Sequence, residues 1–296
     1  MMEEFKELTT EQSESSSEHF SSLSIKDAVL LMNREDERCI EAVRNQADNI
    51  ARVTEMAAET LKNGGRLVYM GAGTSGRLGM LDAVECPPTF GVADDVVIGL
   101  VAGGECSFSH PREDAEDSCQ EGVDDLKRIG LSDKDMVVGV AASGRTPYVI
   151  GGIEYAKTIG ARTAAIACAE NSKLSCHTDT IELVTGAEVL TGSTRLKAGT
   201  ACKMAMNMIS TIAMKEQGHV YKNYMVDVQA SNEKLRHRAV NIVCAVTGCP
   251  EEKAAEVLAL SANDVKTAIV MIEKNTDCES ARTLIDQASG FLDRIL

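Results

Sequence analysis

Aromatic side chains are scarce in this sequence, and basic side chains are outnumbered. Only 3% of the 296 residues are aromatic and none is tryptophan, so we expect no aromatic platform for stacking bases or sugar rings. The 30 Lys and Arg residues face 45 Asp and Glu residues, which gives a net charge of −15. This balance excludes nucleic-acid binding, because a phosphate backbone requires clusters of basic residues. An anionic ligand would have to be held by local donors.

Long apolar runs and cysteine motifs are also missing. The chain has no apolar stretch of roughly 18 residues, and its start, MMEEFKELTTEQ, lacks the basic and apolar regions of a secretory signal. We therefore expect a cytoplasmic protein without a membrane span. The 10 cysteines follow no framework spacing, which is typical of reduced thiols. The nearest groups, Cys168 with Cys176-His177 and Cys244 with Cys249, lack the spacing of a zinc site, so we expect no metal.

Helical and strand patterns alternate through the middle of the chain. After a Ser-rich segment at 9–24, a helical pattern begins at the candidate cap Ser24. A second helix follows, which Gly64-Gly65 ends; its apolar residues at helical spacing are Ile40, Val43, Ala47, Ile50, Val53, Ala57 and Leu61. Short continuous apolar runs then predict five buried strands, with helix-compatible segments between most of them. This pattern favours an α/β fold with a parallel five-stranded sheet flanked by helices. The predicted strands are Leu67–Met70, Val96–Ala102, Met136–Ala141, Thr163–Cys168 and Ile181–Val184.

The remainder of the chain has a helical pattern, with short helices expected over 232–247, 251–259, 263–273 and 277–289. We expect these helices to serve packing or dimerisation. The resulting division is an N-terminal arm with helices over 1–55, a central α/β domain over 56–225, and a C-terminal helical region over 226–296.

The first Gly-rich loop, 71–77, follows the first predicted strand. Parallel sheets bind ligands at the carboxyl ends of their strands, and glycines let backbone N–H groups approach an anion at a helix N-terminus. The candidate phosphate ligands are Gly73, Thr74, Ser75 and Arg77. The loop also matches GxGxxG, so dinucleotide binding is an alternative, although the only candidate for the acid that holds a ribose is Glu105. No GxxxxGK[ST] motif is present, which excludes a P-loop.

Two further segments join Ser and Thr hydroxyls to basic residues at expected helix starts. One lies at 142–147 after the third strand, where Pro147 suits the first turn of a helix, and the other lies at 191–197. One such loop alone is a helix cap, but three in an acidic protein favour a site for one compact phosphate. Their candidate ligands are Ser143, Gly144, Arg145, Thr146, Ser193, Thr194 and Lys197.

Carboxylates supply the second half of the candidate chemistry. Glu85 precedes Pro87-Pro88, which we expect to end a helix and to hold the next loop stiffly, leaving Glu85 partly buried as a general acid or base. The acidic run Glu113–Asp117 is placed on a helix after the second strand. By composition this run is a solvated acidic face, and a catalytic role for it is the alternative.

Three longer stretches resemble the N-acetylmuramic acid 6-phosphate etherases, which have the sugar isomerase (SIS) fold. They are GAGTSGRLGMLDAVECPPTFG, AASGRTPYVIGGIEYAK and TGSTRLKAGTACKMAMNMIS, and the resemblance extends from about residue 8 to the region around Arg238. It implies a SIS domain over 56–225, a homodimer with sites at or near the subunit interface, and no metal or organic cofactor. It also implies a sugar-phosphate substrate and a place in peptidoglycan recycling.

The implied reaction cleaves the lactyl ether of N-acetylmuramic acid 6-phosphate (MurNAc 6-phosphate) to GlcNAc 6-phosphate and D-lactate. The family motifs imply Glu85 as the acid at the leaving oxygen and Glu116 as the base at C2. One departure is the arm, where residues 10–17 lack the basic residue of the family pattern T-E-x-R-N-P-x-S, which leaves room for an altered substrate preference. Two alternatives are a sugar-phosphate aldose–ketose isomerase and a non-catalytic sugar-phosphate sensor. The presence of both carboxylates argues against the sensor.

Overall fold

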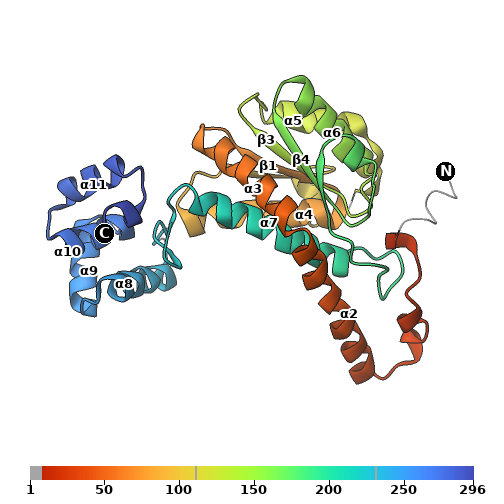
Figure 1. The fold of residues 1–296 in the computed structure, drawn as a ribbon, viewed down its shortest axis with the longest axis horizontal. Coiled ribbons are helices and arrows are strands. Elements are labelled where there is room, and N and C mark those ends of the chain that lie inside the picture. The colour runs from red at the N-terminus through yellow and green to blue at the C-terminus, as the bar shows by residue number, and fades with distance from the viewer. Residues whose placement is uncertain (1–8, 111, 231) are drawn as a thin grey trace. The chain divides into compact units, whose positions relative to one another are not determined.

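The computed structural model describes residues 9–110, 112–230 and 232–296, and Figure 1 shows their helices and strands. Contacts between residues divide the chain into two units. One unit runs to Val84 and resumes over Asp95–Ser210, and the other comprises Glu85–Asp94 and Thr211–Leu296. The domain boundaries expected at 55/56 and 225/226 stay predictions.

The first unit is built on one parallel sheet. Its strands are β1 Leu67–Gly71, β2 Val97–Val101, β3 Met136–Val140, β4 Arg162–Ala167 and β5 Asp179–Glu182. They lie in the order β2-β1-β3-β4-β5, and every neighbouring pair is parallel. Every residue of β1 and β3 is buried, which explains their continuous apolar sequences. The predicted fold class and the five predicted strands are confirmed.

Helices cover both faces of this sheet (Figure 1). They are α3 Ala47–Lys62, α4 Gly73–Phe90, α5 Cys119–Arg128, α6 Pro147–Thr158 and α7 Lys197–Lys215, whereas α2 Ile25–Asn45 extends away from the sheet. Val68 and Met70 belong to the core that includes buried residues of α5 and α6. On the opposite face, the hydroxyl of Tyr69 donates to the carbonyl oxygen of Met206 in α7 at 3.1 Å. Successive residues of β1 therefore alternate between the faces, and helices meet them on both.

The chain enters the sheet through a polar arm and two helices. The arm contains three short 3-10 helices, and Ser24 caps α2 as predicted. The two helices predicted between Ser24 and Gly64-Gly65 are present, but Ile40 and Val43, which we expected in the second, lie in the first, because α2 ends at Asn45 and α3 begins at Ala47. Gln46 lies between them, and its side-chain oxygen accepts a hydrogen bond from the N–H of Glu182 in β5 at 3.3 Å. Helical periodicity along the sequence does not reveal such a tertiary contact.

The helix after β1 is longer than predicted. We expected Pro87 and Pro88 to end it, but α4 continues through both to Phe90. The fixed φ of proline matches a helix, and the cost at these positions is the loss of two N–H donors near the end of the helix. Gly91, with a φ of +70°, follows the last residue and lets the chain turn away.

The second unit is helical apart from a short hairpin of β6 Val220–Tyr221 and β7 Tyr224–Met225. Its helices are α8 Glu233–Thr247, α9 Glu251–Leu260, α10 Val265–Lys274 and α11 Cys278–Gln287, close to the four predicted segments. Side chains of Asn232, Asp264 and Asp277 cap three of them. The helices share one apolar core. Across the three described ranges, no helix combines the length and the apolar character needed to cross a membrane.

Candidate active site

The first Gly-rich loop joins β1 to α4 at the point where the strand order reverses. β1 lies between β2 and β3, and sheets of this order bind ligands beyond the carboxyl ends of the strands at that switch point. Gly73 has a φ of +52°, which favours glycine. At Gly76, a Cβ would lie 2.4 Å from the carbonyl oxygen of Gly71. These glycines let α4 begin directly at the end of β1, with its unpaired N–H groups at the switch point.

The second loop, 142–147, lies against the first. A Cβ on Gly71 would be 2.7 Å from the carbonyl oxygen of Val140, the last residue of β3. Within the loop, the N–H of Arg145 donates to the hydroxyl of Ser143 at 3.3 Å. The two loops are therefore neighbours at adjacent strand ends.

The third segment, 191–197, reaches the first loop through the start of α7. A Cβ at Gly199 would lie 3.3 Å from Cγ2 of Thr74 and 3.4 Å from the carbonyl oxygen of Thr194. Three segments that are far apart in the sequence thus meet beside the first turn of α4.

Lys197 has a partner inside the protein. Its side chain is 1% exposed, and its ammonium donates to Oε2 of the buried Glu35 at 2.8 Å. Its backbone N–H donates to Glu188, which also accepts from the N–H of Ala198. The expected contact between Lys197 and phosphate stays a prediction, and it would require this ion pair to separate.

A cavity of about 340 Å³ opens in the first unit at the ends of β1 and β2. Its lining residues are Ala72, Gly73, Thr74, Arg77, Val101, Ala102, Ser107, Arg112 and Glu116. The cavity thus brings the first loop together with one of the two predicted carboxylates. The predicted residues that do not line it are Ser75, Glu85, Ser143, Gly144, Arg145, Thr146, Ser193, Thr194 and Lys197.

Arg77 supplies positive charge to this cavity. Its Nε donates to the carbonyl oxygens of Ser107 at 3.1 Å and Phe108 at 3.0 Å. Among the side chains that the structure describes, no carboxylate pairs with it. Arg77 also lies in the first turns of α4, where the helix dipole is positive. The guanidinium charge is therefore available to an anion.

Arg112 and Ser107 are lining residues that the sequence reasoning missed. Arg112 donates to Asp114 at 3.4 Å and to Glu121 at 3.0 Å, and these two carboxylates raise the pKa of Arg112 above its usual value. Ser107 is 2% exposed, and its hydroxyl has no hydrogen-bond partner within the described part of the chain. Buried hydroxyls are normally bonded, so this one suits a ligand. Neither residue lies in a Gly-rich motif, and no signal in the sequence separates them from ordinary loop residues.

Glu116 lies in a 3-10 helix, Glu113–Asp117, directly before Ser118, the N-cap of α5. We expected this run on a helix after the second strand, and the structure places it on a short 3-10 helix that precedes α5. The hydroxyl of Thr146 donates to Oε1 of Glu116 at 2.9 Å. A hydroxyl of the second loop, predicted to bind phosphate, is thus bonded to the predicted base.

Glu85 lies near the end of α4 and belongs to the second unit. We expected its carboxylate to be partly buried, but it is exposed in the single chain. Its backbone carbonyl accepts from the hydroxyl of Thr89 at 2.8 Å. Glu85 shares the exposed side of α4 with two apolar residues, Leu81 at 39% exposure and Val84 at 64%.

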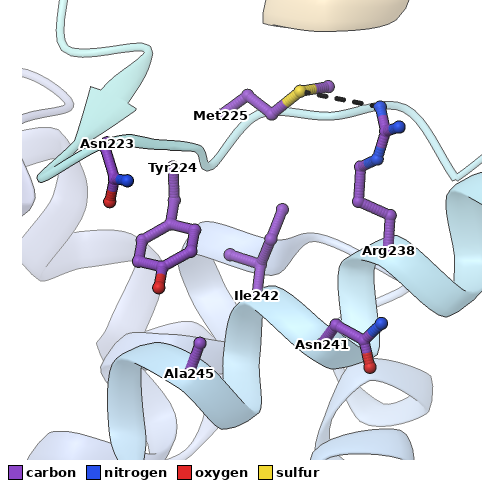
Figure 2. A pocket seen from close by; sticks show the side chains of 7 residues that line it. All are labelled: Asn223, Tyr224, Met225, Arg238, Asn241, Ile242 and Ala245. Atoms are coloured by element: carbon purple, nitrogen blue, oxygen red, sulfur yellow. Dashed lines mark hydrogen bonds between the residues drawn. The ribbon is translucent and has the colours of Figure 1, made fainter.

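A second cavity, of about 340 Å³, lies in the second unit between β7 and α8. Figure 2 shows Arg238 extending from α8 toward Met225, with Nη1 to Sδ at 3.9 Å. The remaining lining residues are Asn223, Tyr224, Asn241, Ile242 and Ala245. None of the seven is acidic, so this cavity lacks the carboxylate that acid–base chemistry requires.

Two family descriptions match parts of the chain. The N-terminal SIS domain of glucokinase regulatory protein matches residues 49–157, and the C-terminal lid domain of the same protein matches residues 222–276. Among solved structures, a phosphoheptose isomerase from Neisseria gonorrhoeae superposes with a TM-score of 0.50 at 14% identity, covering 64% of this chain and 99% of that one. This likeness concerns the fold alone.

Curated relatives match the chain over almost its whole length. An N-acetylmuramic acid 6-phosphate etherase from Bacillus pumilus is 47% identical over 294 residues, which cover 99% of this chain and 97% of the relative. Another, from Francisella tularensis subsp. novicida, is 52% identical over 287 residues, covering 96% of this chain and 97% of the relative. With this identity over the full length of both chains, and with the SIS sheet and loops in place, the chain belongs to the N-acetylmuramic acid 6-phosphate etherase family.

Proposed function

We propose that this chain is a carbon–oxygen lyase that cleaves the lactyl ether of MurNAc 6-phosphate, giving GlcNAc 6-phosphate and D-lactate. The observation that carries the proposal is the identity of 47% and 52% to etherases over 99% and 96% of the chain. The cavity adds physical support, because it combines one carboxylate with two guanidinium groups in a strongly acidic protein.

The charges of the cavity suit this substrate. MurNAc 6-phosphate carries two anionic groups, the phosphate and the lactyl carboxylate, and Arg77 and Arg112 both line the cavity. In the proposal, the start of α4 and the hydroxyls of Thr74, Ser75 and Ser143 hold the phosphate. The remaining predicted phosphate ligands retained as part of the proposal are Gly73, Gly144, Arg145, Ser193, Thr194 and Lys197. Anchoring the far end of the sugar positions C2 and C3 for reaction.

The chemistry requires one base and one acid. When the sugar ring is open, the C1 aldehyde acidifies the C2 proton, which Glu116 removes. Glu85 then protonates the lactyl oxygen as its bond to C3 breaks, and lactate leaves. Water adds to the resulting unsaturated aldehyde at C3, so that the sum of both steps is hydrolysis of the ether. Each general acid or base step of this kind contributes about 10²- to 10⁴-fold.

We further propose that the protein is a cytoplasmic homodimer that acts in peptidoglycan recycling. Exposed apolar side chains support the dimer, because such patches mark protein interfaces. On α2, Ile25 is 87% exposed and Val29 61%, and on α4 Val84 is 64% exposed. A substrate derived from the cell-wall sugar MurNAc supports the assignment to recycling.

The direct test is to incubate the purified protein with MurNAc 6-phosphate and to measure lactate. We expect stoichiometric release of lactate and GlcNAc 6-phosphate. Interconversion of aldose and ketose phosphates without lactate would identify an isomerase instead. Binding of the sugar phosphate without turnover would identify a sensor. Either result would overturn the proposed function.

The two carboxylates have separable roles. Glu116→Gln should lose both lactate release and exchange of the C2 hydrogen with solvent deuterium, because both begin with the same proton abstraction. Glu85→Gln should lose lactate release but keep C2 exchange, because its base is intact and only expulsion of the leaving group is blocked. NMR of the C2 proton in D₂O measures the exchange. Exchange in Glu116→Gln but not in Glu85→Gln would reverse the assignment, and circular dichroism controls for folding.

A further inference from the structure

We propose that Thr146 is a positioning residue that holds the general base, and that its hydroxyl does not serve as a phosphate ligand during the reaction. The observation is the 2.9 Å hydrogen bond from Oγ1 of Thr146 to Oε1 of Glu116. The inference rests on the proposed function, because it gives Glu116 the role of base. It also revises the sequence-based expectation for Thr146.

The hydroxyl of Thr146 is not used to cap α6, so it can bond to Glu116. Thr146 occupies the N-cap position of α6, but its side chain makes no capping hydrogen bond. The helix start is instead secured by the backbone, because the N–H groups of Val149 and Ile150 both donate to the carbonyl oxygen of Thr146. With Thr146 only 5% exposed and Pro147 next in sequence, the hydroxyl is held by a rigid, buried support.

Glu116 needs such a support. It lies on a short 3-10 helix and its side chain is exposed, so the local backbone does not fix its rotamer. Two guanidinium groups, of Arg77 and Arg112, line the same cavity and would attract a freely rotating carboxylate. The bond from Thr146 ties one oxygen to the wall of the second loop.

The two carboxylate oxygens of Glu116 therefore have different roles in the proposed reaction. Oε1 accepts from Thr146, whereas Oε2 has no hydrogen-bond partner within the described part of the chain. Oε2 is therefore the atom that takes the C2 proton. A hydroxyl that orients the base affects the rate of proton abstraction, whereas a hydroxyl that holds phosphate affects substrate binding.

The test is Thr146→Val, which removes the hydroxyl and keeps the shape of the side chain. We expect kcat to fall about 10²-fold with KM changed by less than about threefold, because misplacement of a reacting group costs this much. C2 exchange should fall by the same factor as lactate release. Thr146→Ser, which restores a hydroxyl, should recover most of both rates. The matched control is Thr60→Val, since Thr60 is also buried and its hydroxyl has no partner among the described residues.

Three results would overturn the inference. One is wild-type activity in Thr146→Val. Another is a steep rise in KM with kcat unchanged, which would return Thr146 to the phosphate site. The third is a Thr146→Ser variant as impaired as Thr146→Val, because the hydroxyl would then not be the cause. Wild-type protein that releases no lactate at all would instead overturn the proposed function, and the inference with it.

Discussion

At the scale of single residues, the hydroxyl of Ser143 tests how the second loop contributes to substrate binding. It accepts the N–H of Arg145 at 3.3 Å and lies at the end of β3. A hydroxyl that donates to a charged phosphate is worth about 1.5–3 kcal/mol, so Ser143→Ala should raise KM for MurNAc 6-phosphate at least about 10-fold. Activity on unphosphorylated MurNAc is the internal control and should not change. An unaltered KM for the phosphorylated sugar would remove Ser143 from the site.

Single residues differ in how far the sequence reveals them. The glycines of 71–77 could be predicted to open a ligand-binding turn, because their spacing is tied to a strand end and a helix start. Ser107 and Arg112 could not, because what places them in the cavity is the path of the chain after β2. The hydrogen bond between Thr146 and Glu116 joins residues 30 positions apart, and it depends on how α6 is set against the 3-10 helix. Motifs show which residue types are present, but not which partner each one finds.

At the scale of elements, the starts of β1 and β3 are locked by one ion pair. Asp135 is 2% exposed and accepts hydrogen bonds from Arg66 and from Ser132. Burial alone would raise the pKa of Asp135, but the hydrogen bonds from Arg66 and Ser132 outweigh it and lower that pKa. The pair therefore joins two neighbouring strands at the end of the sheet away from the cavity.

Replacing this acid should destabilise the sheet in a pH-dependent way. Asp135→Asn leaves Arg66 without its carboxylate, so the free energy of unfolding at neutral pH should fall by about 3 kcal/mol. A lowered folded pKa stabilises the protein above the unfolded value of about 3.9, and this contribution is lost as the pH falls through the folded pKa. The difference from wild type should thus shrink below about pH 4 in urea titrations. The exposed neighbour Asp133→Asn is the control, and equal stability of the two variants would refute the prediction.

Elements follow local rules until a distant contact intervenes. The strands could be predicted from short apolar runs, and several helices from their caps, because burial and capping act on adjacent residues. The position of the break between α2 and α3 could not, since the side chain of Gln46 bonds to β5 far along the chain. The opposite error concerns α4. We applied the local rule that proline ends a helix, but α4 continues through Pro87 and Pro88, which lie near its end.

At the scale of the whole molecule, the proposed dimer decides where the acid comes from. Gly73 lines the cavity, whereas Glu85 lies 12 residues further along α4, about 18 Å at 1.5 Å per residue. This distance is far longer than the carbon chain of a hexose. In the proposed dimer we therefore expect a substrate held at Gly73 to meet Glu85 of the second copy. The exposed Leu81 and Val84 beside Glu85 support this proposal, because such side chains fit a face that another chain covers.

Mixed dimers test this arrangement. Glu85→Gln and Glu116→Gln should each be inactive alone, but a heterodimer of the two contains one site with both native carboxylates. Random mixing makes half of the dimers mixed, each with one intact site of two, so activity should recover to about a quarter of wild type. The double variant mixed with wild type is the control, because its heterodimers contain no intact site. No recovery, after light scattering has verified subunit exchange, would contradict the shared site.

Because α4 is continuous, its length fixes the distance between the two sites of the proposed dimer. In the proposed arrangement, α4 begins at the phosphate-binding turn of one site and carries Glu85, the proposed acid of the other site, near its far end. A helix turns about 100° per residue, so one inserted residue between Gly73 and Glu85 would swing the acid off its face as well as displace it by about 1.5 Å. The distance between the phosphate-binding turn and the acid is thus set by the number of residues between Gly73 and Glu85. We expect that number to be the same in natural variants of this enzyme.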